Sequence, residues 1–265
     1  MTDTTALTNN RNQRAFFGVS ALLFAASAAV TIVWCASMMG GMPMPGGWTM
    51  SMAWMRMPEQ TWLGAAASFL GMWIVMMVAM MLPSLVPMLL RYRQAVGRTS
   101  ETRLGRLTAL VGVGYFFVWT AFGMVAFPVG VALAAVEMQS PTLARAVPMA
   151  VGVVTVIVGA LQFTAWKAHQ LACCQKMPSC HRTLRADAGT AGRYGLRLGV
   201  HCSYCCAGLT VILLAGGVMD LRTMALVTAA ITVERLVPGG ERIARAIGAV
   251  IVAAGLFLIA RAGSI

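Results

Sequence analysis

Three cysteines and a histidine fall within six residues, in the run HCSYCC at positions 201–206. If this run is helical, spacings of three and four residues bring Cys202, Cys205 and Cys206 to one face. His201 would then lie at the edge of that face. Thiolates bind soft or borderline ions such as Cu(I) and Zn(II), and a neutral imidazole can complete the shell. The run therefore predicts a soft-metal site. The alternative is that the cysteines only pack against neighbouring helices, because free cysteine is among the most buried residue types.

The preceding polar segment carries the same kinds of ligand. His169, Cys173 and Cys174 are spaced at i, i+4 and i+5, and Cys180 and His181 follow a few residues later. Two such groups that flank one loop can meet in space, so we predict that Cys173 and Cys174 join the three thiols of the later run. The spacing is not that of a zinc finger, which sets out two ordered CxxC pairs. Cys180 and His181 are interpreted as ordinary loop residues.

Methionine is the second soft-ligand theme. Eight methionines lie between residues 38 and 57, at or beyond the expected outer membrane face: Met38, Met39, Met42, Met44, Met50, Met52, Met55 and Met57. Thioethers remain competent ligands outside the cell, where thiols oxidise, so an external Met-rich segment suits Cu(I).

The next apolar run continues this pattern. Met72, Met76 and Met80 repeat every four residues, which places them on one helix face. Methionine is also a common gap-filler in helix packing, and that is the alternative for this stripe. Together, the external methionines, the Met-lined helix and the thiols trace a route for a soft cation.

The composition defines the environment of these residues. Hydrophobic residues make up 59% of the 265 residues and charged residues only 11%, whereas a soluble domain carries about 25% charged residues. We therefore predict an integral membrane protein whose apolar surface faces the lipid bilayer. The net charge of +12 is explained by basic residues that flank apolar spans, so no nucleic-acid partner is predicted.

We predict an all-α, polytopic membrane helix bundle of about seven transmembrane helices. The predicted spans are residues 15–39, 63–90, 107–136, 147–166, 198–219, 221–234 and 243–260. The sixth is short, or re-entrant. Residues 15–265 form one transmembrane helical domain, preceded by a polar tail at 1–14. This domain includes a Met-rich external loop at 40–62 and a Cys/His-rich cytoplasmic loop at 167–197.

The distribution of basic residues predicts the orientation. With the N-terminus in the cytoplasm, inside segments hold 16 of the 20 Lys and Arg residues, which agrees with the positive-inside rule. We therefore predict a multi-pass protein of the bacterial inner membrane. Six of the seven cysteines then lie on or near the cytoplasmic side, and only Cys35 lies toward the outside. In a reducing cytosol they are thiols or metal ligands, not structural disulfides.

Glu234 is a further candidate ligand. An ionised carboxylate inside a membrane span costs several kcal/mol unless it is paired, which marks such an acid as functional. The alternative is an interfacial Glu234 paired with Arg235 or Arg242. Lys167 follows Trp166 and fits an interfacial belt.

The chain resembles a bacterial family of predicted metal-binding integral membrane proteins of unknown function. The resemblance runs from about residue 73 to the C-terminus. It is carried by residues 76–83 (MMVAMMLP), 162–174, 199–206 and 217–221, and by Glu234. It implies a multi-helix membrane protein with a metal site and no established reaction.

These observations favour a protein that binds, delivers or transports Cu(I), with zinc as the alternative metal. A different class of function is an accessory or assembly subunit of a larger membrane metalloenzyme complex, with a membrane-protein partner or a second copy of the chain. An enzyme is disfavoured, because oxidases and haem proteins need more histidine ligands than the three present. No P-loop or phosphorylation domain that would drive active transport is visible.

Overall fold

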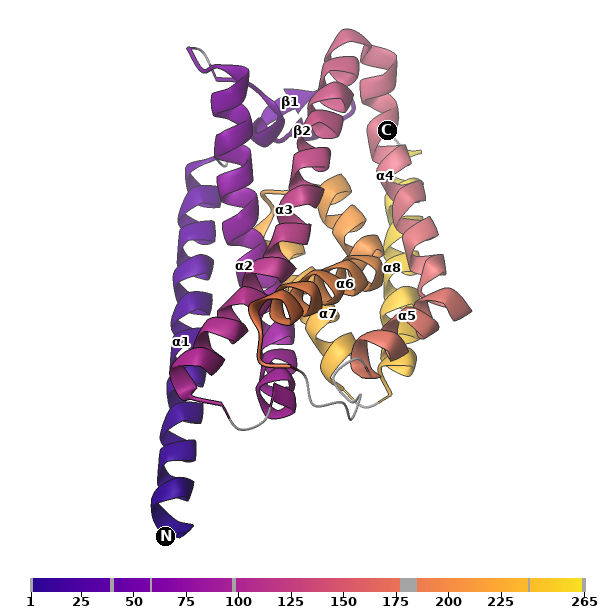
Figure 1. The fold of residues 1–265 in the computed structure, drawn as a ribbon. Coiled ribbons are helices and arrows are strands. Elements are labelled where there is room, and N and C mark those ends of the chain that lie inside the picture. The colour runs from indigo at the N-terminus through magenta and orange to yellow at the C-terminus, as the bar shows by residue number, and fades with distance from the viewer. Residues whose placement is uncertain are drawn as a thin grey trace.

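The computed structural model describes residues 2–38, 41–57, 59–96, 99–176, 185–237 and 239–263. The helices are α1 (Thr2–Ser37), α2 (Trp62–Val96), α3 (Glu101–Gln139), α4 (Pro141–Leu161), α5 (Ala165–Lys176), α6 (Ala188–Gly216), α7 (Leu221–Leu236) and α8 (Gly240–Ala262). Figure 1 shows them as one bundle, with α5 beside α7 and α8 at its lower edge. The prediction of an all-α fold is confirmed.

Six of these helices are long and apolar enough to cross a membrane: α1, α2, α3, α4, α6 and α8. The short predicted sixth span corresponds to α7, which has 16 residues. At about 1.5 Å per residue it is about 24 Å long, and a hydrocarbon core is about 30 Å thick. The structure thus supports six helices of membrane length and one shorter helix between α6 and α8.

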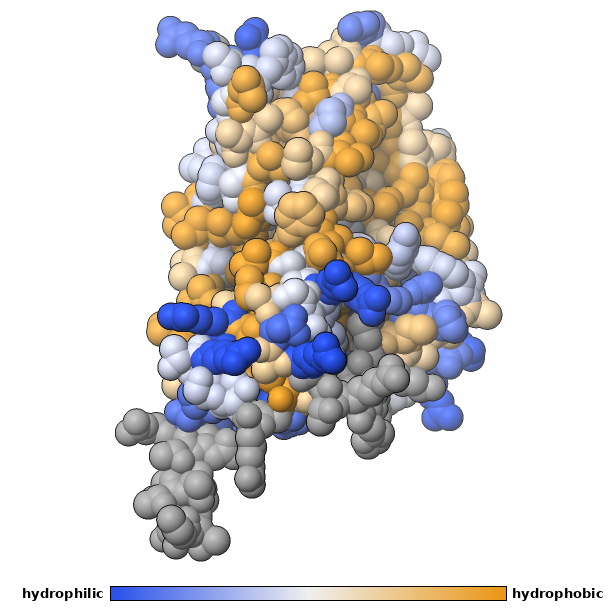
Figure 2. All heavy atoms as spheres, in the orientation of Figure 1, coloured by the Kyte–Doolittle hydropathy of each residue, from blue (hydrophilic) through white to orange (hydrophobic). Residues whose placement is uncertain are grey.

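Polar and apolar side chains are separated along the bundle. In Figure 2 the middle of the visible face is orange, and blue side chains gather in its lower part. The arginine-bearing ends of α2, α3 and α6 meet at this lower end, where the Arg103 guanidinium donates to the Ala186 carbonyl at 2.6 Å. We call it the basic end. The opposite end carries strands β1 and β2, and we call it the hairpin end.

The Met-rich segment after α1 is folded. Strands β1 (Met42–Met44) and β2 (Trp48–Met50) pair antiparallel, with Met42 opposite Met50. The turn uses Gly46 and Gly47 at φ values of 104° and 75°, a conformation that glycine adopts without steric cost. A short 3₁₀ helix, η1 (Met52–Trp54), follows. The indole of Trp48 donates to the Ala144 carbonyl at 2.8 Å and so anchors the hairpin to α4.

The segment 167–197, expected to be a loop, is helical over most of its described residues. It contains most of α5 and the first turns of α6, which begins ten residues before the predicted span. Asp187 caps α6, because its carboxylate accepts from the Thr190 amide at 2.9 Å. Arg193 and Arg197 are exposed while Leu198 is buried, so the arginines occupy only the outer face of this helix. Polarity alone therefore misplaced its beginning.

Glycines bring α6 into close contact with α3. A Cβ atom at Gly195 would lie 2.3 Å from the Val111 carbonyl oxygen, and one at Gly199 would lie 2.9 Å from the Tyr115 carbonyl oxygen. Small residues four apart let membrane helices pack backbone to backbone. This contact fixes the position of the HCSYCC run relative to α3, because the run begins two residues after Gly199. The pair α4 and α8 packs in the same way, through Gly152, Gly159, Gly248 and Gly255.

Candidate metal centre

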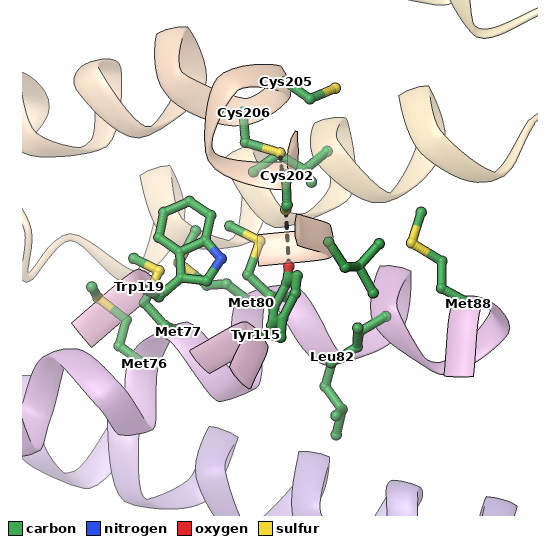
Figure 3. Packing of buried hydrophobic residues seen from close by; sticks show 14 of the residues in the cluster. Met76, Met77, Met80, Leu82, Met88, Tyr115, Trp119, Cys202, Cys205 and Cys206 are labelled. Carbon is green, nitrogen blue, oxygen red and sulfur yellow. Dashed lines mark hydrogen bonds between the residues drawn. The ribbon is translucent and has the colours of Figure 1, made fainter. Parts of the chain in front are cut away.

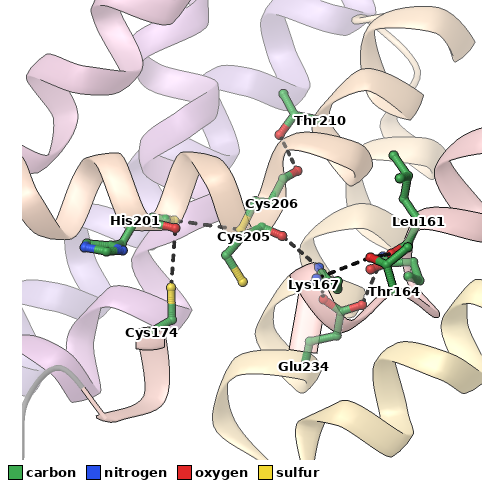
Figure 4. A network of polar contacts seen from close by, with 11 residues as sticks. Leu161, Thr164, Lys167, Cys174, His201, Cys205, Cys206, Thr210 and Glu234 are labelled. Carbon is green, nitrogen blue, oxygen red and sulfur yellow. Dashed lines mark hydrogen bonds and ion pairs between the residues drawn. The ribbon is translucent and has the colours of Figure 1, made fainter. Parts of the chain in front are cut away.

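Four buried cysteine thiols from two helices lie in the interior. On α6, Cys202, Cys205 and Cys206 are each at most 2% exposed, and the sulfurs of Cys202 and Cys206 are 3.8 Å apart. Cys174 of α5 is also buried and donates to the His201 carbonyl at 3.4 Å (Figure 4). Cys205 lies on the same buried face of α6, and Figure 4 shows its side chain on the side of the helix that faces Cys174. We call these four residues the thiol cluster.

The cluster is an open group of sulfurs and not a closed cage. In the described part of the chain, no three His, Cys, Asp or Glu side chains form a group that could hold a metal ion as it stands. A structural Zn(II) site needs four ligands around one point. Cu(I) is a soft ion that thiolates select, and it also accepts a low coordination number. The type of donor in the cluster is therefore compatible with copper.

A buried arginine on α7 contacts this cluster. Arg235 is 4% exposed, and its Nη1 donates to the Cys202 sulfur at 3.0 Å and to the Ser84 hydroxyl at 2.9 Å. Its Nη2 lies 3.1 Å from the Met88 sulfur. A guanidinium is always charged, and a buried charge is costly unless it is paired. Because no carboxylate pairs with Arg235 among the described residues, the guanidinium supplies the positive charge that a Cys202 thiolate needs.

Tyr115 of α3 completes the surroundings of Cys202. Its phenol oxygen lies 2.9 Å from the Cys202 sulfur, and Figure 3 shows the ring pointing from α3 toward α6. The tyrosine is fully buried. Its position follows from the close approach of the two helices at Gly199, so glycine packing sets the distance between phenol and thiol.

A second buried charge pair borders the cluster. The Lys167 ammonium lies 2.8 Å from the Glu234 carboxylate and donates to the Cys205 carbonyl at 2.7 Å (Figure 4). The Gln162 amide donates to Glu234 at 3.2 Å. Burial by itself would lower the pKa of Lys167, but the neighbouring Cys205 and Glu234 outweigh it and raise that pKa above its usual value. The ammonium therefore stays charged.

This pairing differs from the interpretation of both residues from sequence. Glu234 pairs with Lys167 and not with Arg235 or Arg242, and Lys167 is only 5% exposed. The reason is that α5 folds back against α6 and α7, which carries Lys167 into the interior. Successive residues of a helix point about 100° apart, so Glu234 and Arg235 reach different partners: Glu234 contacts Lys167, and Arg235 contacts Cys202.

We expect Glu234→Gln to destabilise the fold by about 3 kcal/mol, because it leaves the Lys167 charge buried without a counter-charge. Lys167→Met should cost a similar amount, and the double variant less than the sum of the two. Thermal unfolding in detergent measures all three. Additive effects would show that the two side chains do not act as a pair.

The other predicted ligands on these helices lie outside the cluster. The His201 ring points away from Cys205 and Cys206 (Figure 4), and only its backbone carbonyl contacts Cys174. The Cys173 sulfur and the His169 Nε2 form a pair of their own, 3.6 Å apart, on a more exposed side of α5. Cys180 and His181 lie outside the described residues.

The methionine stripe of α2 faces the interior. Met72, Met76 and Met80 are at most 4% exposed. Figure 3 shows Met76, Met77 and Met80 near Trp119, with Met88 further along the same helix. From Met72 to Met88 the stripe covers about 24 Å, at about 1.5 Å per residue. It therefore runs from the hairpin end toward Met88 and its contact with Arg235, with Ser84 at the position between Met80 and Met88.

Reasoning from sequence missed Arg235, Tyr115, Ser84 and Met88 as neighbours of the thiols. One signal was present for Arg235: an ionisable residue in an apolar helix of a membrane protein marks a functional site. The other three belong to helices distant in sequence, and only the packing of α2 and α3 against α6 brings them together.

Comparison with protein families supports a connection with copper. Residues 70–258 match the model of the family PpoB2, described as copper chaperone. The match includes the thiol cluster, Arg235 and the methionine stripe, and it agrees with the metal-related family that the motifs resemble. Neither the curated proteins nor the solved structures include a match. Because the matched region covers more than two thirds of the 265 residues, the chain belongs to the PpoB2 copper chaperone family.

Proposed function

We propose that this protein is a multi-pass membrane copper chaperone that holds Cu(I) at the thiol cluster and releases it to an acceptor. The observation that carries this proposal is the set of four buried thiols on α5 and α6, with the Arg235 guanidinium 3.0 Å from the Cys202 sulfur. The description of its family indicates copper as the metal. In the proposed orientation the N-terminus is cytoplasmic, and the membrane is the bacterial inner membrane.

Charge balance explains how the interior can hold the ion. Cu(I) bound by two thiolates has a net charge of about −1, which is costly in a low-dielectric interior. Arg235 offsets that charge, while Lys167 and Glu234 neutralise each other beside Cys205. A complex at Cys202 and Cys206 is therefore neutral overall. Proton release on binding accompanies the conversion of thiols to thiolates.

The methionines of α2 provide a path by which copper reaches the thiol cluster in this proposal. Thioethers bind Cu(I) without deprotonation, and they are uncharged, so an ion passes from one to the next without a change in the charge of the protein. We propose that copper enters at the hairpin end, follows Met72, Met76 and Met80 along α2, and reaches Met88 beside Arg235 and the thiols. His169, Cys173 and His201 are not needed for this path.

A second candidate is an accessory subunit that donates copper to a membrane metalloenzyme. The family description favours it, because a chaperone passes its metal to another protein. The two candidates differ in a measurable way. If the protein is an assembly subunit, its deletion leaves the partner enzyme short of copper. The purified protein, reconstituted alone in proteoliposomes, then moves no copper across the membrane.

Elemental analysis of protein purified in detergent under anaerobic conditions, after copper supplementation, tests the proposal. We expect about one copper ion per chain and little zinc, because thiolates in a low-coordination site select Cu(I). The double variant Cys202→Ser and Cys206→Ser should lose the copper. Cys173→Ser is the matched control, since it removes a nearby thiol that lies outside the cluster. Equal copper in the wild type and the double variant would refute the proposal.

A further inference from the structure

A second group of sulfur atoms lies at the hairpin end. Cys35 of α1 is 2% exposed, although α1 as a whole is mostly exposed, and its thiol lies 3.8 Å from the Met219 sulfur. Met219 belongs to the turn between α6 and α7. Contact between a thiol and a thioether from such distant parts of the chain brings together two soft ligands.

Two cavities adjoin this pair. One has a volume of about 120 Å³, and half of its twelve lining residues are methionines: Met38, Met52, Met55, Met57, Met72 and Met219. The other, of about 450 Å³, is lined by Cys35 and Asp220 among others, and it shares Met38 and Met219 with the first. Methionines that only fill gaps in a core leave no space beside them. Here they surround open space that can hold an ion.

The turn that carries Met219 is firmly built. Gly217 has a φ of 114°, a conformation that side-chain-bearing residues rarely adopt. Asp220 caps α7, and its carboxylate accepts from the amides of Arg222 and Thr223, each at 3.1 Å. These contacts hold Met219 in place opposite Cys35, so the pair is a product of the fold and not of a freely moving loop.

We propose that Cys35, Met219, Met38 and Met72 form a second binding site, for a soft monovalent cation, at the hairpin end. We call it the outer sulfur site. The inference rests on the proposed function, because the proposed copper path begins at this site. Met72 is both a lining residue of the cavity and the first methionine of the buried stripe on α2. A cation bound here therefore lies at the start of the methionine stripe Met72, Met76 and Met80, which runs along α2 in the direction of Met88.

Binding to this site can be measured without the thiol cluster. The test uses the variant Cys202→Ser and Cys206→Ser, titrated with Cu(I) in competition with a chromogenic chelator, and with Ag(I) as a redox-inert substitute. We expect it to keep one weaker site, which loses its ion during purification, so the purified wild type still holds about one copper ion per chain and the purified variant holds little. Adding Met219→Leu should weaken that site at least about tenfold, since even the loss of an outer-shell partner costs about 10- to 100-fold in metal affinity. Leucine keeps the side-chain volume, so the fold should survive.

The control is Met42→Leu, which removes an exposed methionine of the hairpin that lines neither cavity. It should leave the affinity unchanged. Alkylation of Cys35 by a small thiol reagent, followed by mass spectrometry of its peptide, gives a second readout. Ag(I) should protect Cys35 in the cluster variant, and Met219→Leu should remove that protection.

The outcomes separate the two proposals. If the cluster variant binds no Cu(I) or Ag(I) while the wild type binds copper, the outer sulfur site is wrong and the thiol-cluster function stands. If the purified wild type retains no copper but Cu(I) and Ag(I) in solution still protect Cys35 from alkylation, the proposed function fails and the outer site remains. Equal weakening by Met219→Leu and Met42→Leu would also overturn the outer sulfur site.

Discussion

Gly195→Ala is expected to separate α3 from α6, to destabilise the fold by about 3 kcal/mol and to abolish copper retention. The added methyl group would lie 2.3 Å from the Val111 carbonyl oxygen and 3.0 Å from two further backbone atoms of Val111. Backbone atoms cannot rotate away as a side chain does, so the helices must move apart. Tyr115 and Cys202, four and seven residues further along their helices, move apart with them.

The matched control is Gly192→Ala, which makes the same chemical change less than one turn earlier on the same helix. Nothing lies within 4 Å of a Cβ atom at Gly192. Alanine has a higher helix propensity than glycine by up to about 1 kcal/mol, so this variant should be as stable as the wild type or slightly more stable. Thermal unfolding and copper content are measured for both. A Gly195→Ala protein that melts like Gly192→Ala and keeps its copper would show that the close contact is not needed.

The helix-level features of the site could be predicted from sequence because they depend on local periodicity. The three thiols of α6 were expected on one face, and they are buried together in the structure. The methionines of α2 were expected as a stripe, and they face the interior. Spacing along one helix fixes which side chains share a face. These features therefore need no knowledge of the neighbouring helices.

What could not be predicted depends on contacts between distant segments. The choice of Cys174 over Cys173 depends on how α5 packs against α6, since the two side chains point about 100° apart. The partner of Glu234 depends on the same return of α5, which brings Lys167 to 2.8 Å. Hydropathy also failed to show that α6 begins inside the segment 167–197. The arginines on one face of α6 made an amphipathic helix appear to be a polar loop.

Arg235→Met is expected to weaken Cu(I) binding about 100-fold, which corresponds to about 2.8 kcal/mol. Methionine preserves the long apolar stem beside Ser84 and Met88 but removes the charge that lies 3.0 Å from the Cys202 sulfur. The copper-thiolate complex then keeps a net negative charge in the interior, where the loss of one partner of a buried pair costs about 3 to 5 kcal/mol. Competition with a chromogenic Cu(I) chelator measures the affinity.

Arg235→Lys separates charge from geometry. Lysine keeps the positive charge but lacks the planar guanidinium fork. In the wild type one nitrogen of that fork donates to the Cys202 sulfur and the Ser84 hydroxyl, and the other contacts the Met88 sulfur. If charge balance governs binding, this variant should recover most of the affinity that Arg235→Met loses. If the fork is needed to position Cys202, both variants should bind equally weakly. Wild-type affinity in Arg235→Met would contradict both explanations, because the thiols would then hold copper without a counter-charge.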